Sequence, residues 1–192
     1  MATFNATITA SADDAQEANN TVTLTDAVLN VNATTQFAGI RFQNVTIPAG
    51  STITAATLTF YFISGSYDDP YLTIKGNDVD DAAAFSAVNN DVSSRTMTTA
   101  SVTWDQNSVG IGLETSPDIS AVVQEIIDRG GWSSGNSIAF ILAAIDNSST
   151  FRVRAYDGTT DTFPTLDITY TPGSGGSGQP PRSLHQFRQR VP

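Results

Sequence analysis

Apolar and polar residues alternate along several short segments of this chain, and this period of two is the feature that most constrains its fold. In the segment 53–63, Leu58, Phe60 and Phe62 are apolar, and the residues between them are threonine and tyrosine. Such alternation is typical of a β-strand with one buried and one exposed face. The pattern predicts an all-β fold, an antiparallel, jelly-roll-like β-sandwich. The predicted strands are 4–10, 21–24, 40–47, 53–63, 71–76, 96–104, 137–145, 150–156 and 166–171.

One segment departs from this pattern and predicts an amphipathic α-helix at about residues 117–129. Ser116 suits the N-cap, Pro117 suits the first helical position, and Asp118 complements the helix dipole. Gly130 and Gly131 then end the helix. A lone helix of this length is marginal in water, so we expect it to pack on the sandwich. Its apolar stripe consists of Ile119, Val122, Val123, Ile126 and Ile127.

The composition changes abruptly after residue 172. Residues 173–178 read Gly-Ser-Gly-Gly-Ser-Gly, which is typical of an engineered flexible linker. Residues 179–192 are basic and contain two adjacent prolines. We interpret them as an appended peptide, either a ligand or a tag for another protein, with a native basic tail as the alternative. The predicted organisation is one domain over residues 1–172, a linker and a peptide.

No signal peptide is visible, because Met1 leads directly into an alternating segment instead of a basic and then an apolar stretch. Two interpretations stay open. Either an export signal has been removed, or the protein leaves the cell by lysis, as virion proteins do.

The domain lacks most of the side chains that enzymes use for catalysis. The chain has no cysteine, and its one histidine, His185, lies in the terminal peptide. A Ser-His-Asp triad, a Cys-His pair, a histidine-ligated zinc and a thiol redox centre are therefore excluded from the domain. Two carboxylates could serve glycoside hydrolysis, but no spacing selects such a pair. We expect a protein that is not an enzyme.

The charge balance narrows the class of partner. All nineteen acidic residues of the chain, but only six of its nine basic ones, fall within residues 1–172. Such a domain repels the phosphates of nucleic acids and anionic lipids, so neither is expected as a partner. No stretch approaches the roughly 18 apolar residues that a membrane span requires. Cations and neutral polymers such as glycans remain compatible with this charge.

Two acidic clusters are candidate calcium sites, because calcium prefers six to eight oxygen ligands and clustered carboxylates supply them. Neither cluster matches the EF-hand pattern, and the alternative is that both are solvated loops that cap strand ends. No other cofactor is expected. The candidate ligands are Asp13, Asp14 and Glu17 in the first cluster and Asp78, Asp80 and Asp81 in the second.

Four further residues are candidates for binding a ligand. Tyr67 and Tyr71 flank a predicted turn, where an exposed aromatic ring could stack on a sugar. Arg152 and Arg154 alternate on one predicted strand and could together bind a carboxylated sugar. In the alternative interpretation, the arginines pair with aspartates on a neighbouring strand and the tyrosines are structural.

Several motifs together give the chain a resemblance to DNRLRE-type modules over nearly all of residues 5–171. These are β-sandwich domains of bacterial surface proteins, related to a carbohydrate-binding module family. The resemblance implies a jelly-roll-like, non-catalytic, extracellular module, and it implies sugar binding only loosely. The segments that carry it are 11–15, 39–42, 45–58, 101–104, 116–119, 131–136, 154–158 and 164–166.

These observations predict a non-enzymatic structural or adhesive module that lies outside cells, on a virion, a filament or a bacterial surface. Its expected partners are copies of itself or other proteins of that particle or surface. The alternative is a carbohydrate-binding module that recognises a polysaccharide.

Overall fold

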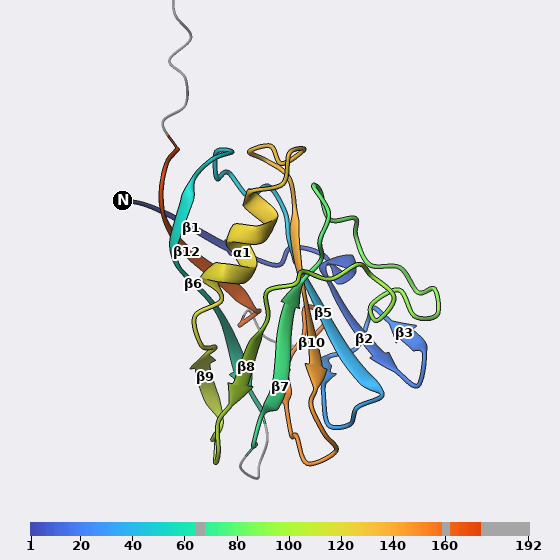
Figure 1. Cartoon of the computed structure of the whole chain (residues 1–192). Coiled ribbons are helices and arrows are strands. Elements are labelled where there is room, and N and C mark those ends of the chain that lie inside the picture. The colour runs from blue at the N-terminus through green and yellow to red at the C-terminus, as the bar shows by residue number, and fades with distance from the viewer. Residues whose placement is uncertain (64–67, 159–161, 174–192) are drawn as a thin grey trace, which may run out of the picture.

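The computed structural model describes residues 1–63, 68–158 and 162–173, and it has the predicted β-sandwich fold. Two six-stranded sheets, in which all paired strands are antiparallel, face each other (Figure 1). Tyr67 and the terminal peptide lie outside the described residues.

The first sheet, called sheet A, has the long strand β6 near its centre. Strands β12 and β9 pair with opposite sides of β6, β1 pairs with β12, and β11 links the end of β6 to β4. The first residues of the chain and the end of β12 therefore lie side by side. The strands of sheet A are β1 (Ala2–Thr7), β4 (Val28–Asn30), β6 (Thr52–Phe62), β9 (Gly112–Thr115), β11 (Arg152–Arg154) and β12 (Thr165–Thr171).

The second sheet, called sheet B, runs in the order β3-β2-β5-β10-β7-β8. A short 3-10 helix, η1 (Ser11–Asp13), leads into β2. The strands of sheet B are β2 (Asp14–Ala18), β3 (Thr21–Thr23), β5 (Gln36–Phe42), β7 (Tyr71–Gly76), β8 (Val102–Asp105) and β10 (Ile138–Ala144).

The main core fills the space between the two sheets. Phe60 and Phe62 alternate on the inner face of β6, and both pack against Trp104 of β8 and against Phe151. The ring centroids of these contacts are 5.3–6.0 Å apart, within the range of favourable edge-to-face aromatic pairs. The phenylalanines of the alternating segment 53–63 therefore join an aromatic cluster to which both sheets contribute.

The predicted helix is present but shorter, and it covers one side of β6. Helix α1 (Ser120–Ile127) lies beside β6 and β7 (Figure 1). The preceding residues, predicted as its first turn, instead bond to the exposed side of β6. Ser116 Oγ accepts from the backbone N–H of Leu58 at 3.0 Å, and Asp118 accepts from that of Ala56 at 2.9 Å. These side chains accept hydrogen bonds from the backbone N–H groups of β6 on the side where no described strand pairs with it.

The outer face of sheet B is covered by a long excursion, residues 77–101, which joins β7 to β8. It brings Phe85 and Val92 onto Ala15 of β2 and Ile141 of β10, forming a second, smaller apolar core. Arg95 fixes the excursion by donating to the carbonyls of residues 83 and 84 and by stacking over the Phe85 ring. The outer face of sheet A has no such covering among the described residues.

The predicted strands 40–47 and 96–104 differ from the observed strands in their bounds. The segment 40–47 alternates, but β5 begins earlier and ends at Phe42, because Asn44 adopts a left-handed φ of 52° that a strand cannot contain. Val45 and Ile47 are still buried, as irregular chain. The segment 96–104 contributes only β8 and one isolated bridge at Met97.

Candidate functional site

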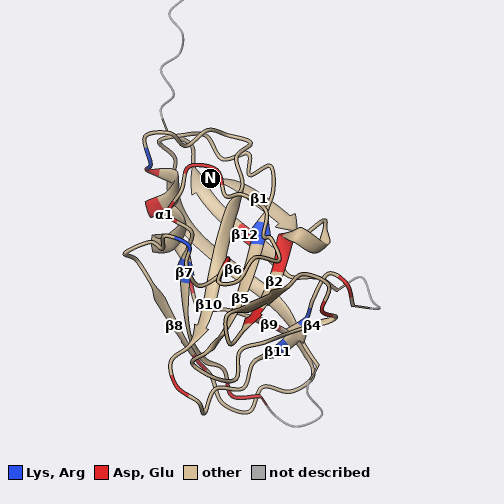
Figure 2. Cartoon of the chain, turned by 90° about the vertical axis from the view of Figure 1, so that its right-hand side faces the viewer, with Lys and Arg blue, Asp and Glu red and all other residues tan. Residues whose placement is uncertain are grey.

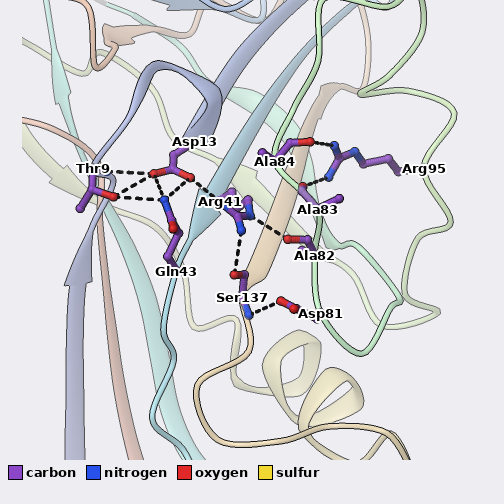
Figure 3. Close-up of polar contacts among 10 residues, drawn as sticks. All are labelled: Thr9, Asp13, Arg41, Gln43, Asp81, Ala82, Ala83, Ala84, Arg95 and Ser137. Atoms are coloured by element: carbon purple, nitrogen blue, oxygen red, sulfur yellow. Dashed lines mark hydrogen bonds and ion pairs between the residues drawn. The ribbon is translucent and has the colours of Figure 1, made fainter.

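Asp13, a predicted calcium ligand, is built into the interior of the protein. Only 1% of it is exposed, and both carboxylate oxygens have internal donors. The Thr9 backbone N–H and hydroxyl donate at 3.1 and 3.0 Å, Gln43 Nε2 donates at 2.8 and 3.0 Å, and Arg41 Nη1 donates at 2.8 Å (Figure 3). Asp13 therefore joins η1 to β5.

Arg41 extends this network to the excursion. Its Nε donates to the Ala82 carbonyl at 2.7 Å, and its Nη2 donates to the Ser137 hydroxyl at 2.9 Å (Figure 3). Asp81, a predicted ligand in the second acidic cluster, accepts from the backbone N–H of Ser137 at 2.8 Å. The two predicted metal clusters thus contribute to one network that attaches the excursion to sheet B.

Asp14 and Glu17 lie on opposite faces of β2, although the sequence analysis gave no strand here and, as the alternative to a calcium site, predicted a solvated loop. That prediction is wrong, because residues 14–17 form a buried strand between β3 and β5. Asp14 accepts from the backbone N–H of Tyr156 at 2.7 Å. On the opposite face, Glu17 accepts from the N–H groups of Val92 and Ser93 at 3.1 and 2.9 Å and from the Ser93 hydroxyl.

The pKa of Asp14 is strongly perturbed by its surroundings. Burial raises the pKa of its carboxyl to about 7, the hydrogen bond from Tyr156 opposes that rise, and the nearby charges of Asp157, Asp13 and Asp26 add to it. The folded protein therefore binds this proton more tightly than the unfolded chain does. Protonation of Asp14 favours folding.

Asp78 and Asp80, the remaining predicted metal ligands, form ion pairs with Arg129, which follows α1. The Arg129 Nε donates to Asp80 at 2.7 Å, and its Nη1 donates to Asp78. Across the described ranges, no three acidic or histidine side chains are arranged so that they could hold a metal ion. The acidic residues are instead scattered over loops, helix α1 and strands such as β2 and β9 (Figure 2).

Arg152 and Arg154 lie on the same face of β11, as predicted, but internal contacts occupy both. Arg152 pairs with the fully buried carboxylate of Asp68, with its Nε 3.2 Å from Oδ1. Arg154 stacks over the Tyr61 ring of β6, with its guanidinium carbon 3.7 Å from the ring centroid. The alternative interpretation had both arginines pair with aspartates on a neighbouring strand; Arg152 does pair with an aspartate, although Asp68 lies outside the named strands, and Arg154 contacts a tyrosine of β6.

Tyr71, a predicted ligand-binding residue, lies in an open cleft. The cleft has a volume of about 300 Å³ and lies where the segments before β7, after β8 and after β10 meet. This is the lower end of the sandwich in Figure 1. The cleft is lined by Asp69, Pro70, Tyr71, Asp105, Gln106, Asn107, Asp146 and Ser148.

Internal hydrogen bonds orient two of the cleft carboxylates. Asp69 accepts from the backbone N–H of Ser108 at 2.6 Å, and Asp146 accepts from the N–H and hydroxyl of Ser148 at 2.8 and 2.6 Å. Hydrogen bonds from Ser148 hold the pKa of Asp146 below its usual value, so this carboxylate is ionised at neutral pH. The cleft therefore presents fixed hydrogen-bond acceptors beside one aromatic ring.

Apart from Tyr71, the cleft residues were missed by the sequence analysis. They come from three segments that are far apart in the chain, and polar dipeptides such as Asp146-Asn147 indicate only a turn. No local spacing could have grouped them.

No protein-family model matches this chain, and no curated protein matches it significantly. In the part of the chain that the structure describes, no helix is long and apolar enough to cross a membrane.

Proposed function

We propose that this protein is a non-enzymatic structural or adhesive module that lies outside cells, as part of a virion, a filament or a bacterial surface. The observation that supports this proposal is that several charged side chains bind other segments of the same chain. Arg41, Glu17, Arg129 and Arg152 each tie one segment of the sandwich to another. A domain whose charged side chains bind its own segments is typical of a rigid scaffold. The resemblance to DNRLRE-type surface modules supports the same proposal.

The experiment is to measure the size of the full chain by size-exclusion chromatography with light scattering, followed by negative-stain electron microscopy. Filaments, rings or a defined oligomer would support an assembling structural protein. A monomer at all concentrations, with no attachment to particles or cell surfaces, would contradict the proposal.

The cleft beside Tyr71 favours a second candidate function, the binding of a polysaccharide. A tyrosine face and oriented carboxylates suit a sugar, because the ring packs against its C–H face and the carboxylates accept from its hydroxyls. Asp69, Asp105 and Asp146 repel acidic sugars, so the expected ligands are neutral or amino sugars. A carboxylated sugar, the candidate ligand that depended on Arg152 and Arg154, does not suit this cleft.

A glycan array with the full chain tests this candidate. We expect binding to neutral glycans that Tyr71→Ala weakens at least tenfold. The control is Tyr61→Ala, which removes a tyrosine from outside the cleft. Equal loss in both variants, or binding confined to acidic glycans, would contradict a glycan site at this cleft.

A further inference from the structure

The strands at the margins of the two sheets differ in how well they are protected from pairing with another chain. An edge strand exposes unpaired backbone N–H and C=O groups, and natural proteins block such edges with short strands, charges or covering segments. In sheet B, β3 has three residues, and β8 has four and ends in Asp105. In sheet A, β9 has four residues and includes Glu114. These three edges are poor templates for a further strand.

Two other margins of sheet A are covered by side chains of the protein itself. On the side of β6 next to α1, backbone N–H groups donate to the side chains of Ser116, Asp118 and Gln124. The Gln124 side chain accepts from the Ile53 N–H at 2.7 Å. Strand β4 has three residues, and its Asn30 N–H donates to the Gln16 side chain at 2.5 Å.

Strand β1 has none of these protections. It is six residues long, with the sequence Ala-Thr-Phe-Asn-Ala-Thr, and carries no charge, proline or glycine (Figure 2). Among the described residues, no backbone group pairs with the side of β1 that faces away from β12. In an antiparallel pair, every second residue of the outer strand directs its N–H and C=O outward. β1 is therefore the longest unblocked edge of the described sandwich.

A groove runs along this open side of β1. Its volume is about 480 Å³, and residues 4–7 of β1 line it together with Thr9, Gln43 and Asn44. No lining residue belongs to β12, so the groove follows the unpaired side of the strand. The inward side chains of Ala2, Phe4 and Ala6 pack against the main core yet are only half buried. An added strand would complete their burial.

We infer that β1 pairs antiparallel with β1 of a second copy of this chain, joining two copies of sheet A into one continuous sheet. This inference rests on the proposed assembling function and names the surface that performs it. Two domains this acidic repel each other, and the uncharged strand β1 is where two copies can meet at the least electrostatic cost.

The pattern of β1 is also self-complementary. Residues directly opposite each other in an antiparallel pair lie on the same face of the sheet. A two-fold pairing centred on Phe4 or Asn5 places threonine and asparagine against each other on the outer face and apolar residues against each other on the inner face. Such an interface is isologous and closes as a dimer. It is smaller than a standard protein interface, so we expect weak, concentration-dependent association that multiple copies on a particle would strengthen.

The first test compares charged variants by light scattering over a concentration series of the full chain. In Thr3→Lys/Asn5→Lys, like charges meet across either centre of the pairing, and we expect dimerisation to weaken at least tenfold. The control, Thr99→Lys/Ser101→Lys, adds the same charge at exposed positions of the excursion and should dimerise like the wild type. General repulsion cannot explain the difference, because both variants reduce the negative charge equally.

A second test uses the absence of cysteine from the chain. Single variants Thr3→Cys and Asn5→Cys, alone and mixed, are oxidised mildly and analysed for disulfide-linked dimers. Antiparallel pairing predicts a disulfide between two Asn5→Cys chains or between an Asn5→Cys chain and a Thr3→Cys chain. It predicts no disulfide between two Thr7→Cys chains. These small changes keep the inference testable even if the lysine variant does not fold.

Each outcome has a defined meaning. Lysine-sensitive dimerisation with the antiparallel pattern of disulfides supports pairing through β1. An oligomer that persists in Thr3→Lys/Asn5→Lys overturns the pairing, yet leaves an assembling module in place. A monomer without disulfide links overturns the pairing, and binding of β1 to a strand of another protein would then be the remaining use of this edge.

Discussion

At the scale of single residues, buried carboxylates hold this sandwich together, and burial raises the pKa of one of them, Asp14, far above its ordinary value. Its side chain joins β2 to the segment after β11 through the Tyr156 N–H, and Asp157, Asp13 and Asp26 lie nearby. A pKa of about 7, against 3.8 ordinarily, means that the folded state retains a proton that the unfolded chain has released. The contribution of Asp14 to stability therefore falls as the pH rises from about 4 to about 7 and is lowest above that range.

We predict that Asp14→Asn removes this pH dependence. Asparagine is neutral at every pH and still accepts from the Tyr156 N–H, so the variant should gain stability relative to the wild type above pH 7. The shift of the Asp14 pKa corresponds to a gain of the order of 4 kcal/mol. Urea unfolding from pH 4.5 to 8.5 measures it, with the exposed Asp105→Asn as the control. Parallel profiles for wild type and Asp14→Asn would contradict the assignment.

We also predict that metal removal leaves the stability unchanged. The carboxylates of Asp13, Asp78 and Asp80 already accept from Arg41 or Arg129, so calcium would have to displace internal ion pairs. Thermal unfolding with excess calcium and with EDTA should give the same midpoint. A calcium-dependent rise of several degrees would show a site that these contacts do not reveal, and Asp78→Asn would then locate it.

At the scale of elements, the excursion 77–101 depends on Glu17 as an anchor. Its carboxylate accepts from two backbone N–H groups and the Ser93 hydroxyl, and glutamine would turn an N–H₂ group toward one of these donors. We predict that Glu17→Gln loses about 2 to 3 kcal/mol. Amide hydrogen exchange should accelerate over 77–101 more than in β6. Glu114→Gln, on β9, is the control, and uniform acceleration across the chain would argue against a local anchor.

The segment before α1 protects the unpaired backbone groups of β6, and a substitution of Asp118 tests this protection. Burial acts to raise the pKa of Asp118, but hydrogen bonds from Ala56 and Ser120 outweigh it and hold the pKa below the usual value. This contribution to stability is present at neutral pH and is lost as the pH falls through that lowered pKa.

We predict that Asp118→Ala loses about 1 to 2 kcal/mol at neutral pH and aggregates more readily, because it leaves the Ala56 N–H of β6 without an acceptor. Asp118→Asn retains an acceptor oxygen and should behave closer to the wild type. Urea unfolding and light scattering on heating measure both effects. If alanine and asparagine variants behave alike, the hydrogen bond does not protect this edge.

At the scale of the whole molecule, one aromatic cluster joins the two sheets. Phe151 touches Phe60 and Phe62 of sheet A and Trp104 of sheet B, with ring centroids 5.3–5.9 Å away. We predict that Phe151→Ala loses about 3 to 5 kcal/mol, because it leaves a cavity in a rigid core. Phe163→Ala, at a half-buried ring that packs on Tyr156, should lose less. Chemical unfolding followed by tryptophan fluorescence measures both variants, and equal losses would contradict a central role for the cluster.

The alternation around Leu58, Phe60 and Phe62 was enough to predict the sandwich, because a period of two determines which side chains can share a face. The apolar stripe of α1 was likewise visible, since it depends on residues at most eight positions apart. The start of the helix was not, because Ser116 and Asp118 accept from the backbone of β6, and the helical turns begin only at Ser120. A local signal cannot show that a distant strand competes for the same side chain.

The sequence by itself determined the fold class of this protein, its acidic charge and its lack of histidine and cysteine chemistry in the domain, because these depend on composition and local periodicity. Only the tertiary structure decided that residues 14–17 form a buried strand, that Arg152 pairs with Asp68, and that Tyr71 lies in a cleft with residues of three segments. The physical reason is that burial and pairing of a charged side chain depend on which distant segment packs against it, and in a sandwich those neighbours are far away in the chain.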